Sequence, residues 1–325
     1  MTGAAEPSSP SPPTLAGTAC LVLGGGGFIG THLCRSLLRR GARVHGYGRR
    51  RAYPEVLAGV RWTAGEFSDR AALARAVEGA ELVFHLLGGS TPESSNKDPV
   101  ADLMATATSS LHLLEICRAA GTRKLVFVSS GGTVYGIPRH VPIAEAASTD
   151  PISAYGVSKL AVEKYLGLYR HLHGLDYAVL RLANPFGPYQ DPDRRQGVVA
   201  ALVQAVLDGR PVEIWGDGRV VRDFIYAPDA AEAVAMAAAY AGPARVLNVG
   251  SGVGRSVLDV VDDVGAVLGV PRVERTHKPG RATDVPVNVL DISLIRAELG
   301  WTPTTPWPDA LRATAAWLRG RGGSA

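Results

Sequence analysis

Tyr155 and Lys159, four residues apart, are the two side chains in this sequence best suited to acid–base chemistry. They lie in SAYGVSKLAVEKYLG, whose apolar spacing predicts a helix over about 153–173, so both side chains share one face a turn apart. An ammonium beside a phenol is expected to lower the pKa of the phenol. Tyr155 could then take a proton from a substrate hydroxyl as hydride leaves the carbon, or return one during reduction. A tyrosine and a lysine at this spacing are also common on helix surfaces, so the interpretation depends on whether the chain binds a redox cofactor.

A glycine-rich turn near the start of the chain predicts such a cofactor site. The predicted strand TACLVLG runs directly into GGGGFIG, and the amphipathic helix THLCRSLLRR follows. Gly24, Gly27 and Gly30 allow a tight turn, a close approach of the backbone to a pyrophosphate and close packing of helix on strand. The other residues expected to contact the dinucleotide are Phe28, Ile29 and Leu86.

The end of the second strand bears on the choice between NAD and NADP. A carboxylate there would hydrogen-bond the ribose 2′-hydroxyl of NAD, whereas the 2′-phosphate of NADP needs cations and no carboxylate. The sequence has Gly48 at that position, followed directly by Arg49 and Arg50. Arginine runs are commonly solvated surface, but the missing carboxylate is an independent observation, so we favour NADP(H). Glu66, after the strand WTAGEF, is placed to accept from the adenine amino group, although a surface acid fits this position as well.

Apolar runs of strand length alternate with amphipathic helical stretches through the first half of the chain. This alternation predicts βαβ units and an α/β fold with a doubly wound, Rossmann-type parallel sheet. Beyond residue 185 the elements shorten and Gly and Pro interrupt them, which is typical of a smaller lobe. The predicted organisation is a disordered tail at 1–17, a dinucleotide-binding domain at 18–184, a mainly substrate-binding lobe at 185–319 with segments returning to the first domain, and a tail at 320–325.

The composition argues against several other classes of protein. Hydrophobic residues make up 46% of the 325, and no apolar run approaches the roughly 18 residues needed to cross a bilayer. The N-terminal stretch lacks the basic and apolar regions of a secretory signal. The 34 basic residues are spread among 30 acidic ones, so we predict no nucleic-acid partner. The three cysteines have no metal-ligand spacing and are expected to be buried thiols, so we predict no metal site and a cytoplasmic protein.

From about residue 18 to 317 the chain resembles the extended short-chain dehydrogenases, a family that includes nucleotide-sugar epimerases of the UDP-glucose 4-epimerase type, dehydratases and ketoreductases. The motifs that carry the resemblance are GGGGFIG, VFVSSGGTVYG, YGVSK, RLANPFGP, IWGDGRVVRDFIY and KPGRATDVPVNVLD. The resemblance implies that Lys159 also anchors the cofactor ribose. It further implies that Asn184, Arg222 and Arg281 hold a nucleotide diphosphate, which two guanidinium forks and an amide would suit.

Two positions depart from the family pattern. Members usually carry a Ser or Thr hydroxyl two residues before the Thr of Thr-Val-Tyr-Gly, where it bonds the reacting sugar oxygen, and here that residue is Gly131. Ser130 and Thr133 are the nearest replacements. In a regular strand Ser130 points to the face opposite residue 131 and Thr133 to the same face, so we prefer Thr133. Thr106 stands where the family often has an Asn that fixes the active-site helix. No other residue that could take over this role is evident from the sequence.

The choice of reaction follows from what the sequence lacks. Dehydratases of this group need an Asp-Glu pair just after the active-site hydroxyl, and here Gly132 and Thr133 occupy those positions. What remains is a 4-epimerase that recycles its cofactor or a 4-ketoreductase of a deoxysugar that consumes NADPH. The whole-chain resemblance favours the epimerase and the second strand favours the reductase; we predict the epimerase, acting on a nucleotide-linked hexose in carbohydrate biosynthesis. A non-catalytic NADP-binding sensor is a further alternative, against which Tyr155 and Lys159 argue.

Two predicted helices, over about 99–120 and 153–173, correspond to those with which family members commonly pair into a four-helix bundle. We therefore expect a homodimer. The apolar residues expected to meet the partner are Leu111, Leu114, Leu160, Tyr165 and Leu168. Burial against the chain's own sheet is the competing explanation for several of them.

Overall fold

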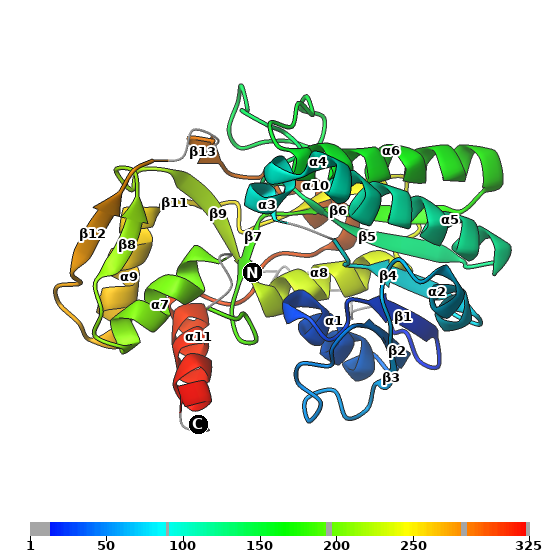
Figure 1. The fold of residues 1–325 in the computed structure, drawn as a ribbon, viewed down its shortest axis with the longest axis horizontal. Coiled ribbons are helices and arrows are strands. Elements are labelled where there is room, and N and C mark those ends of the chain that lie inside the picture. Colours follow the sequence, from blue (N-terminus) through cyan, green and yellow to red (C-terminus); the bar gives the residue numbers. More distant parts are fainter. Residues whose placement is uncertain (1–13, 89–90, 193–196, 281–284, 323–325) are drawn as a thin grey trace, which may run out of the picture.

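A seven-stranded parallel sheet crosses the larger part of the molecule (Figure 1), within the residues that the computed structural model describes: 14–88, 91–192, 197–280 and 285–322. In spatial order its strands are β10 (Val246–Val249), β6 (Asp176–Leu182), β5 (Lys124–Ser130), β4 (Leu82–His85), β1 (Ala19–Leu23), β2 (Arg43–Gly48) and β3 (Arg61–Ala64). Neighbouring strands are parallel throughout, and the direction of winding reverses between β1 and β4. This order confirms the predicted doubly wound Rossmann-type fold.

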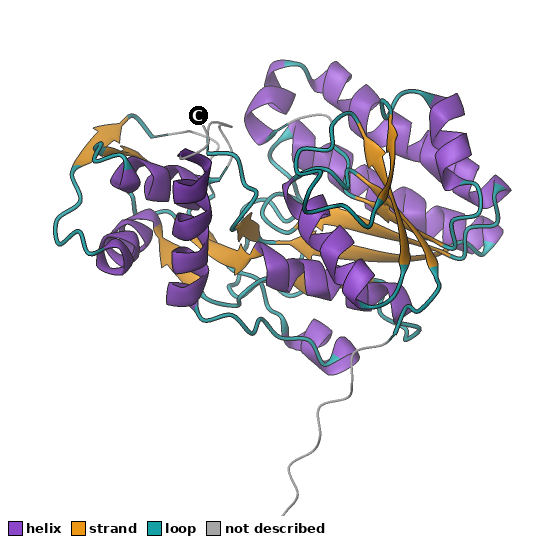
Figure 2. Cartoon of the chain, turned by 90° about the horizontal axis from the view of Figure 1, so that it is seen from below, coloured by secondary structure: helices purple, strands orange, loops and turns teal. Residues whose placement is uncertain are grey.

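Helices cover both faces of the sheet (Figure 2), as the near-continuous apolar strands require. The helices on one face are α1 (Phe28–Arg39), α8 (Ala227–Ala239) and α10 (Ser293–Leu299). Those on the other face are α2 (Arg70–Val77), α5 (Ser109–Ala119) and α6 (Ala154–His173). Strand β5 shows the alternation, since Val126 and Val128 join the first cluster while Leu125 and Phe127 join the second.

The smaller part of the molecule has its own apolar core around Phe186, Val203, Val261 and Leu311. Its strands are β7 (Asn184–Phe186), β9 (Val221–Tyr226), β11 (Gly254–Ser256) and β13 (Val287–Asn288), with β8 (Val212–Trp215) paired to β12 (Arg275–Lys278). Its helices are α7 (Val198–Leu207), α9 (Val257–Leu268) and α11 (Trp307–Gly322). Because α8 and β10 lie between these segments in the sequence but pack with the large sheet, the chain passes repeatedly between the two parts.

The helix expected over 99–120 is interrupted by a π-helical turn. It consists of α4 (Pro99–Leu103), the turn η1 (Met104–Thr108) and α5, and the short α3 (Pro92–Lys97) precedes it. Of the apolar residues expected on the outer side of α5 and α6, Tyr165 and Leu168 are exposed. The expectation was wrong for Leu114, which is buried against the large sheet, and Leu111 and Leu160 are half-buried against the two cores.

The described chain extends further at both ends than the sequence predicts. Leu15, within the tail expected at 1–17, is buried in the core, and α11 runs to Gly322, within the tail expected at 320–325. Residues 1–13 and 323–325 lie outside the described residues. The cysteines are buried free thiols, and no helix in the described ranges is both long and apolar enough to span a bilayer.

The turn between β1 and α1 generates the first prediction. A Cβ at Gly30 would lie 2.1 Å from the carbonyl oxygen of Gly24, whereas a Cβ at Gly27 would meet only that oxygen, at 3.3 Å. Gly30→Ala should therefore lower the free energy of unfolding by about 1–3 kcal/mol, as overpacking does, and weaken NADH binding. Gly27→Ala is the matched control and should change both far less. Urea unfolding and NADH fluorescence titration measure the two effects, and equal losses in both variants would contradict this account of the turn.

Candidate active site

A cavity of about 600 Å³ lies at the carboxyl ends of the sheet strands, where doubly wound proteins bind their ligands. Ile29, after β1, and Leu86, after β4, line it at the point where the winding of the sheet reverses. The residues that line it from β5, α6 and the smaller part of the molecule include Val128, Ser130, Tyr155, Lys159, Phe186 and Phe224. The cavity therefore joins the predicted cofactor end to the predicted chemical pair.

Tyr155 and Lys159 meet in this cavity as the helical spacing predicts. Lys159 is 3% exposed, and its Nζ donates to the carbonyl oxygen of Val128 at 3.1 Å and lies 5.7 Å from the centre of the Tyr155 ring. Burial lowers the pKa of Lys159 to about 8, although the charges of Glu163 and Asp102 act in the opposite direction. At neutral pH the side chain is still mainly an ammonium.

The expected lowering of the phenol pKa is wrong in this structure. Burial raises the pKa of Tyr155 to about 12, and the negative charge of Asp102 adds to this rise. Desolvation destabilises the phenolate. This effect is larger than the stabilisation that the Lys159 ammonium, one helical turn away, gives to the phenolate. The proposed chemistry therefore has to be performed by a tyrosine that is protonated in the resting protein.

Side chains hold the first turn of α6, which positions Tyr155. The N–H group of Ala154 donates to Asn96 Oδ1 at 2.8 Å. The N–H group of Tyr155 donates to Ser95 Oγ at 3.0 Å. Ser153 accepts the third, from Gly156. Because Asn96 also lines the cavity, the α3 segment is at once a wall of the cavity and a support of the catalytic helix.

The turn after β5 gives residues 131 and 132 different environments. The strand ends at Ser130, so the alternation of faces used to compare Ser130 with Thr133 does not continue past it, and Ser130, Gly132 and Thr133 all line the cavity. A Cβ at Gly131 would lie 2.6 Å from Leu290 Cδ1, in the core. Within the described chain Thr133 Oγ1 is buried without a hydrogen-bond partner.

Thr106, which replaces the asparagine of the family pattern, lies in the π-helical turn η1. Ser110 Oγ donates to its carbonyl oxygen at 2.6 Å and stands 2.8 Å from His85 Nε2. His85 is fully buried, and burial holds its pKa well below the usual range, so the ring is neutral. At the position where the family often has an asparagine, this chain therefore has a π-helical turn whose backbone carbonyl is hydrogen-bonded by Ser110.

The residues expected to bind the cofactor follow the carboxyl ends of β1, β2, β3 and β4. Helix α1 begins at Phe28, with Gly27 as an N-cap that has no capping side chain and with no acid in the first turn, which leaves its N–H groups available to a phosphate. Arg49 and Glu66 are largely exposed, at 4.0 Å from each other, and Arg50 is exposed beside them. Gly48 has a φ of +155°, which side chains rarely adopt, so the missing carboxylate also has a backbone explanation.

The residues expected to hold a diphosphate lie on the opposite wall. Asn184 and Arg222 both line the cavity; Asn184 Nδ2 donates to the carbonyl oxygen of Asp223 at 3.0 Å, and Arg222 donates to that of Val285. Arg281 lies outside the described residues.

Two buried groups near this site, Glu163 and Gln190, were not predicted from the sequence. Glu163, four residues after Lys159 on α6, forms a 2.7 Å ion pair with Arg181 and accepts from Ser129. Its position one turn after Lys159 was the available signal. Gln190 lines the cavity, and its buried Oε1 has no hydrogen-bond partner within the described chain. It lies two residues after the motif RLANPFGP.

Residues 20–250 match the NAD dependent epimerase/dehydratase family. The chain belongs to this family. Over 241 residues, 74% of this chain and 77% of the relative, it is 36% identical to the UDP-glucose 4-epimerase of Mycolicibacterium smegmatis. It is 29% identical to the dTDP-4-dehydro-6-deoxyglucose reductase of Escherichia coli, over 90% of this chain and 94% of that protein.

Solved structures of family members have the same fold. The UDP-glucose 4-epimerase of Thermotoga maritima, with UDP-glucose, has a TM-score of 0.89 and 33% identity over 94% of this chain and 99% of its own. That of Thermus thermophilus, in complex with NAD, has a TM-score of 0.86 and 34% identity over 93% and 99%. The chain is an NAD(P)-dependent enzyme of the short-chain dehydrogenase type, as its motifs imply.

The different environments of residues 131 and 132 generate the second prediction. Gly131→Ala should lower the free energy of unfolding by about 1–3 kcal/mol, because the new methyl group meets the buried Leu290. Gly132→Ala is the control: its Cβ would meet nothing closer than 3.9 Å, so stability should be unchanged or rise by about 0.4–1 kcal/mol. Denaturant unfolding of both variants measures this. A larger loss at residue 132 would show that the turn is wrongly described.

Proposed function

We propose that this enzyme is a nucleotide-sugar 4-epimerase, which oxidises a sugar carbinol and reduces the resulting ketone from the other face. The observation that supports it most is the meeting of Tyr155 and Lys159 with a partnerless hydroxyl, Thr133, in one cavity next to the glycine turn. The cavity carries no Asp-Glu pair after β5, because Gly132 and Thr133 stand there, which argues against dehydration. UDP-linked hexoses are the first candidate substrates, since the relatives above are UDP-glucose 4-epimerases.

The glycine turn fits a dinucleotide. A Cβ at Gly26 would lie 2.1 Å from the carbonyl oxygen of Arg50 and one at Gly30 equally close to that of Gly24, so glycine at these positions lets the turn pack backbone against backbone. A Cβ at Gly27 would meet only the carbonyl oxygen of Gly24, at 3.3 Å. The uncapped start of α1 supplies N–H donors for the pyrophosphate. A nicotinamide cofactor held here would supply reversible hydride transfer, so no net reductant would be consumed.

The residues of the chain would move the proton and hold the reactants. Tyr155 removes the proton of the sugar hydroxyl as hydride departs and returns it in the second half of the reaction. Lys159 stabilises the transient phenolate and binds the cofactor ribose. Thr133, with Ser130 as the alternative, hydrogen-bonds the reacting sugar oxygen. Asn184 and Arg222, joined by Arg281, would hold the nucleotide diphosphate.

The second candidate is a ketoreductase of a nucleotide-linked deoxysugar, which the two exposed arginines after β2 favour because a consumed reductant is usually NADPH. The likeness to the Escherichia coli reductase is consistent with it. Turnover that needs stoichiometric NADPH would select this reaction over epimerisation. The buried free thiols support a cytoplasmic location for either activity.

A preference for NADP(H) is part of the proposal and gives the third prediction. Arg49→Ala combined with Arg50→Ala should weaken NADPH binding about tenfold or more, because a charge-assisted hydrogen bond contributes ~1.5–3 kcal/mol. NADH binding should hardly change. Adding a carboxylate by Gly48→Asp would not be a clean test, because a side chain at a φ of +155° is strained. Arg43→Ala, an exposed arginine at the other end of β2, is the control, and tighter binding of NADH than NADPH by the unaltered protein would refute the preference.

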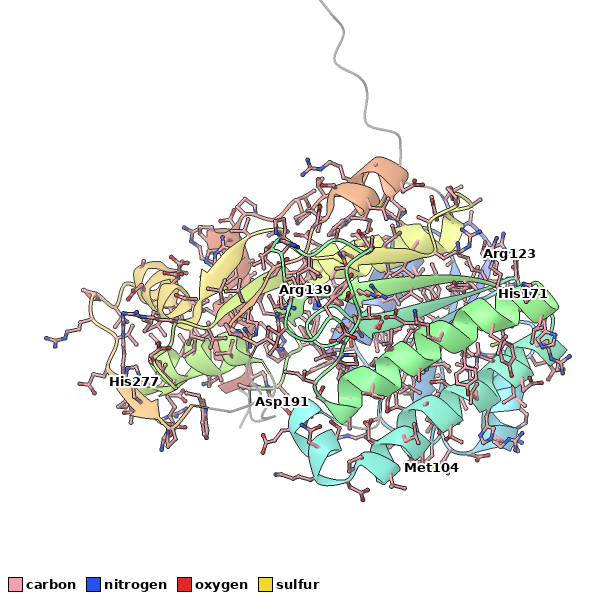
Figure 3. All side chains as sticks on the ribbon, turned by 90° about the horizontal axis from the view of Figure 1, so that it is seen from above. Met104, Arg123, Arg139, His171, Asp191 and His277 are labelled. Atoms are coloured by element: carbon pink, nitrogen blue, oxygen red, sulfur yellow. The ribbon has the colours of Figure 1, made fainter. Side chains whose placement is uncertain are left out.

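A homodimer formed through α4, α5 and α6 is also proposed and gives the fourth prediction. Exposed apolar side chains lie on α4, the π turn η1 and α6, and Figure 3 shows Met104 at the outer edge of the molecule. The exposed members are Val100, Leu103, Met104, Val157, Tyr165, Leu168 and Leu172. Sedimentation velocity should show a dimer at micromolar concentration, and Leu168→Glu should convert it to a monomer. A monomer in the unaltered protein would remove the idea.

The catalytic role of Tyr155 gives the fifth prediction. Tyr155→Phe keeps the ring and its packing, so the free energy of unfolding and cofactor affinity should change little. Turnover should fall by about 10²–10⁴-fold, the range for a positioned acid–base group. Tyr177→Phe, in β6 and outside the cavity lining, is the matched control and should retain turnover. Full activity of Tyr155→Phe on the true substrate would end the proposed mechanism.

A further inference from the structure

A buried carboxylate, that of Asp102, lies behind the Tyr155–Lys159 pair. Asp102 belongs to α4, which packs against α6, and it is 2% exposed. Its Oδ2 accepts from Ser158 Oγ at 2.6 Å. Ser158 stands three residues after Tyr155 and directly before Lys159, so the carboxylate is bound to the turn of α6 that carries both groups.

Other charged and titratable groups also face the pair. Glu163, on α6, is paired with Arg181 of β6, and His85 of β4 is neutral. On α3, which also packs against α6, Glu93 is paired with Lys97 at 3.2 Å. Across the cavity stands Arg222.

We propose that Asp102 is a positioning residue for the redox chemistry: it fixes the first turns of α6 through Ser158, and its negative charge stabilises the ammonium of Lys159. The inference rests on the function proposed above for Tyr155 and Lys159. The direction of the charge effect on Lys159 agrees with it, because Asp102 raises the pKa of that ammonium. The same charge raises the pKa of Tyr155, which keeps the phenol protonated in the resting protein. Since the pKa of Lys159 is only about 8, a change in its surroundings alters its charge near neutral pH.

The consequence can be measured without a sugar substrate. Lys159 carries its charge below pH 8 or so and loses it as the pH rises through that value. If the ammonium binds the cofactor, NADH affinity falls over the same range. Removing the charge of Asp102 lowers the pKa of Lys159 further, so the fall in affinity moves to lower pH.

Asp102→Asn is the variant that tests the charge. The amide has nearly the same size as the carboxylate, and its oxygen can still accept from Ser158. Asp98→Asn is the matched control, because Asp98 is an exposed residue that caps the same helix and asparagine caps equally well. Asp102→Glu restores the charge at the expense of packing. Fluorescence titrations of the full-length protein, freed of bound cofactor, with NADH are made from neutral to alkaline pH, with thermal unfolding recorded for each variant.

The expected result is a midpoint that shifts to lower pH in Asp102→Asn, stays in place in Asp98→Asn and returns towards the original in Asp102→Glu. A purely structural role predicts the opposite order, with the isosteric amide harmless and the longer glutamate disruptive. An unchanged midpoint in Asp102→Asn would overturn the inference and leave the proposed function standing. Failure of the unaltered protein to bind either NADH or NADPH would overturn the proposed function, and this inference with it.

Discussion

The burial of the Lys159 ammonium at the carboxyl end of β5 is the interaction to which most of the site can be traced. A buried charge is unstable unless other groups replace the lost water. Here the carbonyl oxygen of Val128 accepts from it, the Phe127 ring lies 4.7 Å below it, and two acids, Glu163 and Asp102, act on it from α6 and α4. The ammonium therefore ties together one strand and two helices that the sequence separates widely.

The wall opposite Lys159 depends on another buried acid, Asp223 in β9. Its carboxylate accepts from the backbone of Ser251, Gly252 and Leu290, while its carbonyl oxygen accepts from Asn184. Leu290, fixed in this way, fills the space that a side chain at Gly131 would need. The loss of the hydroxyl at residue 131 is thus matched by packing from the smaller part of the molecule, and Thr133 is left as the hydroxyl with no partner in the described chain.

Local patterns in the sequence predicted the parts of this site that local physics determines. The glycine turn, the alternation of strands and helices and the helix of Tyr155 and Lys159 follow from spacing within a few residues, and α6 begins within one residue of the expected position. The features that the sequence did not predict depend on contacts between segments far apart in the chain. The end of β5 at Ser130, the π turn bound by Ser110 and His85, and the rise of the Tyr155 pKa all come from tertiary packing and burial, which spacing along one segment does not encode.

The central claim is that hydride leaves a sugar carbinol and returns to it within one cavity. Incubating the purified protein and its cofactor with UDP-glucose deuterated at C4 tests this most directly, with the products followed by mass spectrometry and NMR. The account predicts UDP-galactose that keeps its deuterium at C4, formed without net consumption of NADH or NADPH. Loss of the deuterium to solvent, or turnover only with stoichiometric reductant, would contradict it.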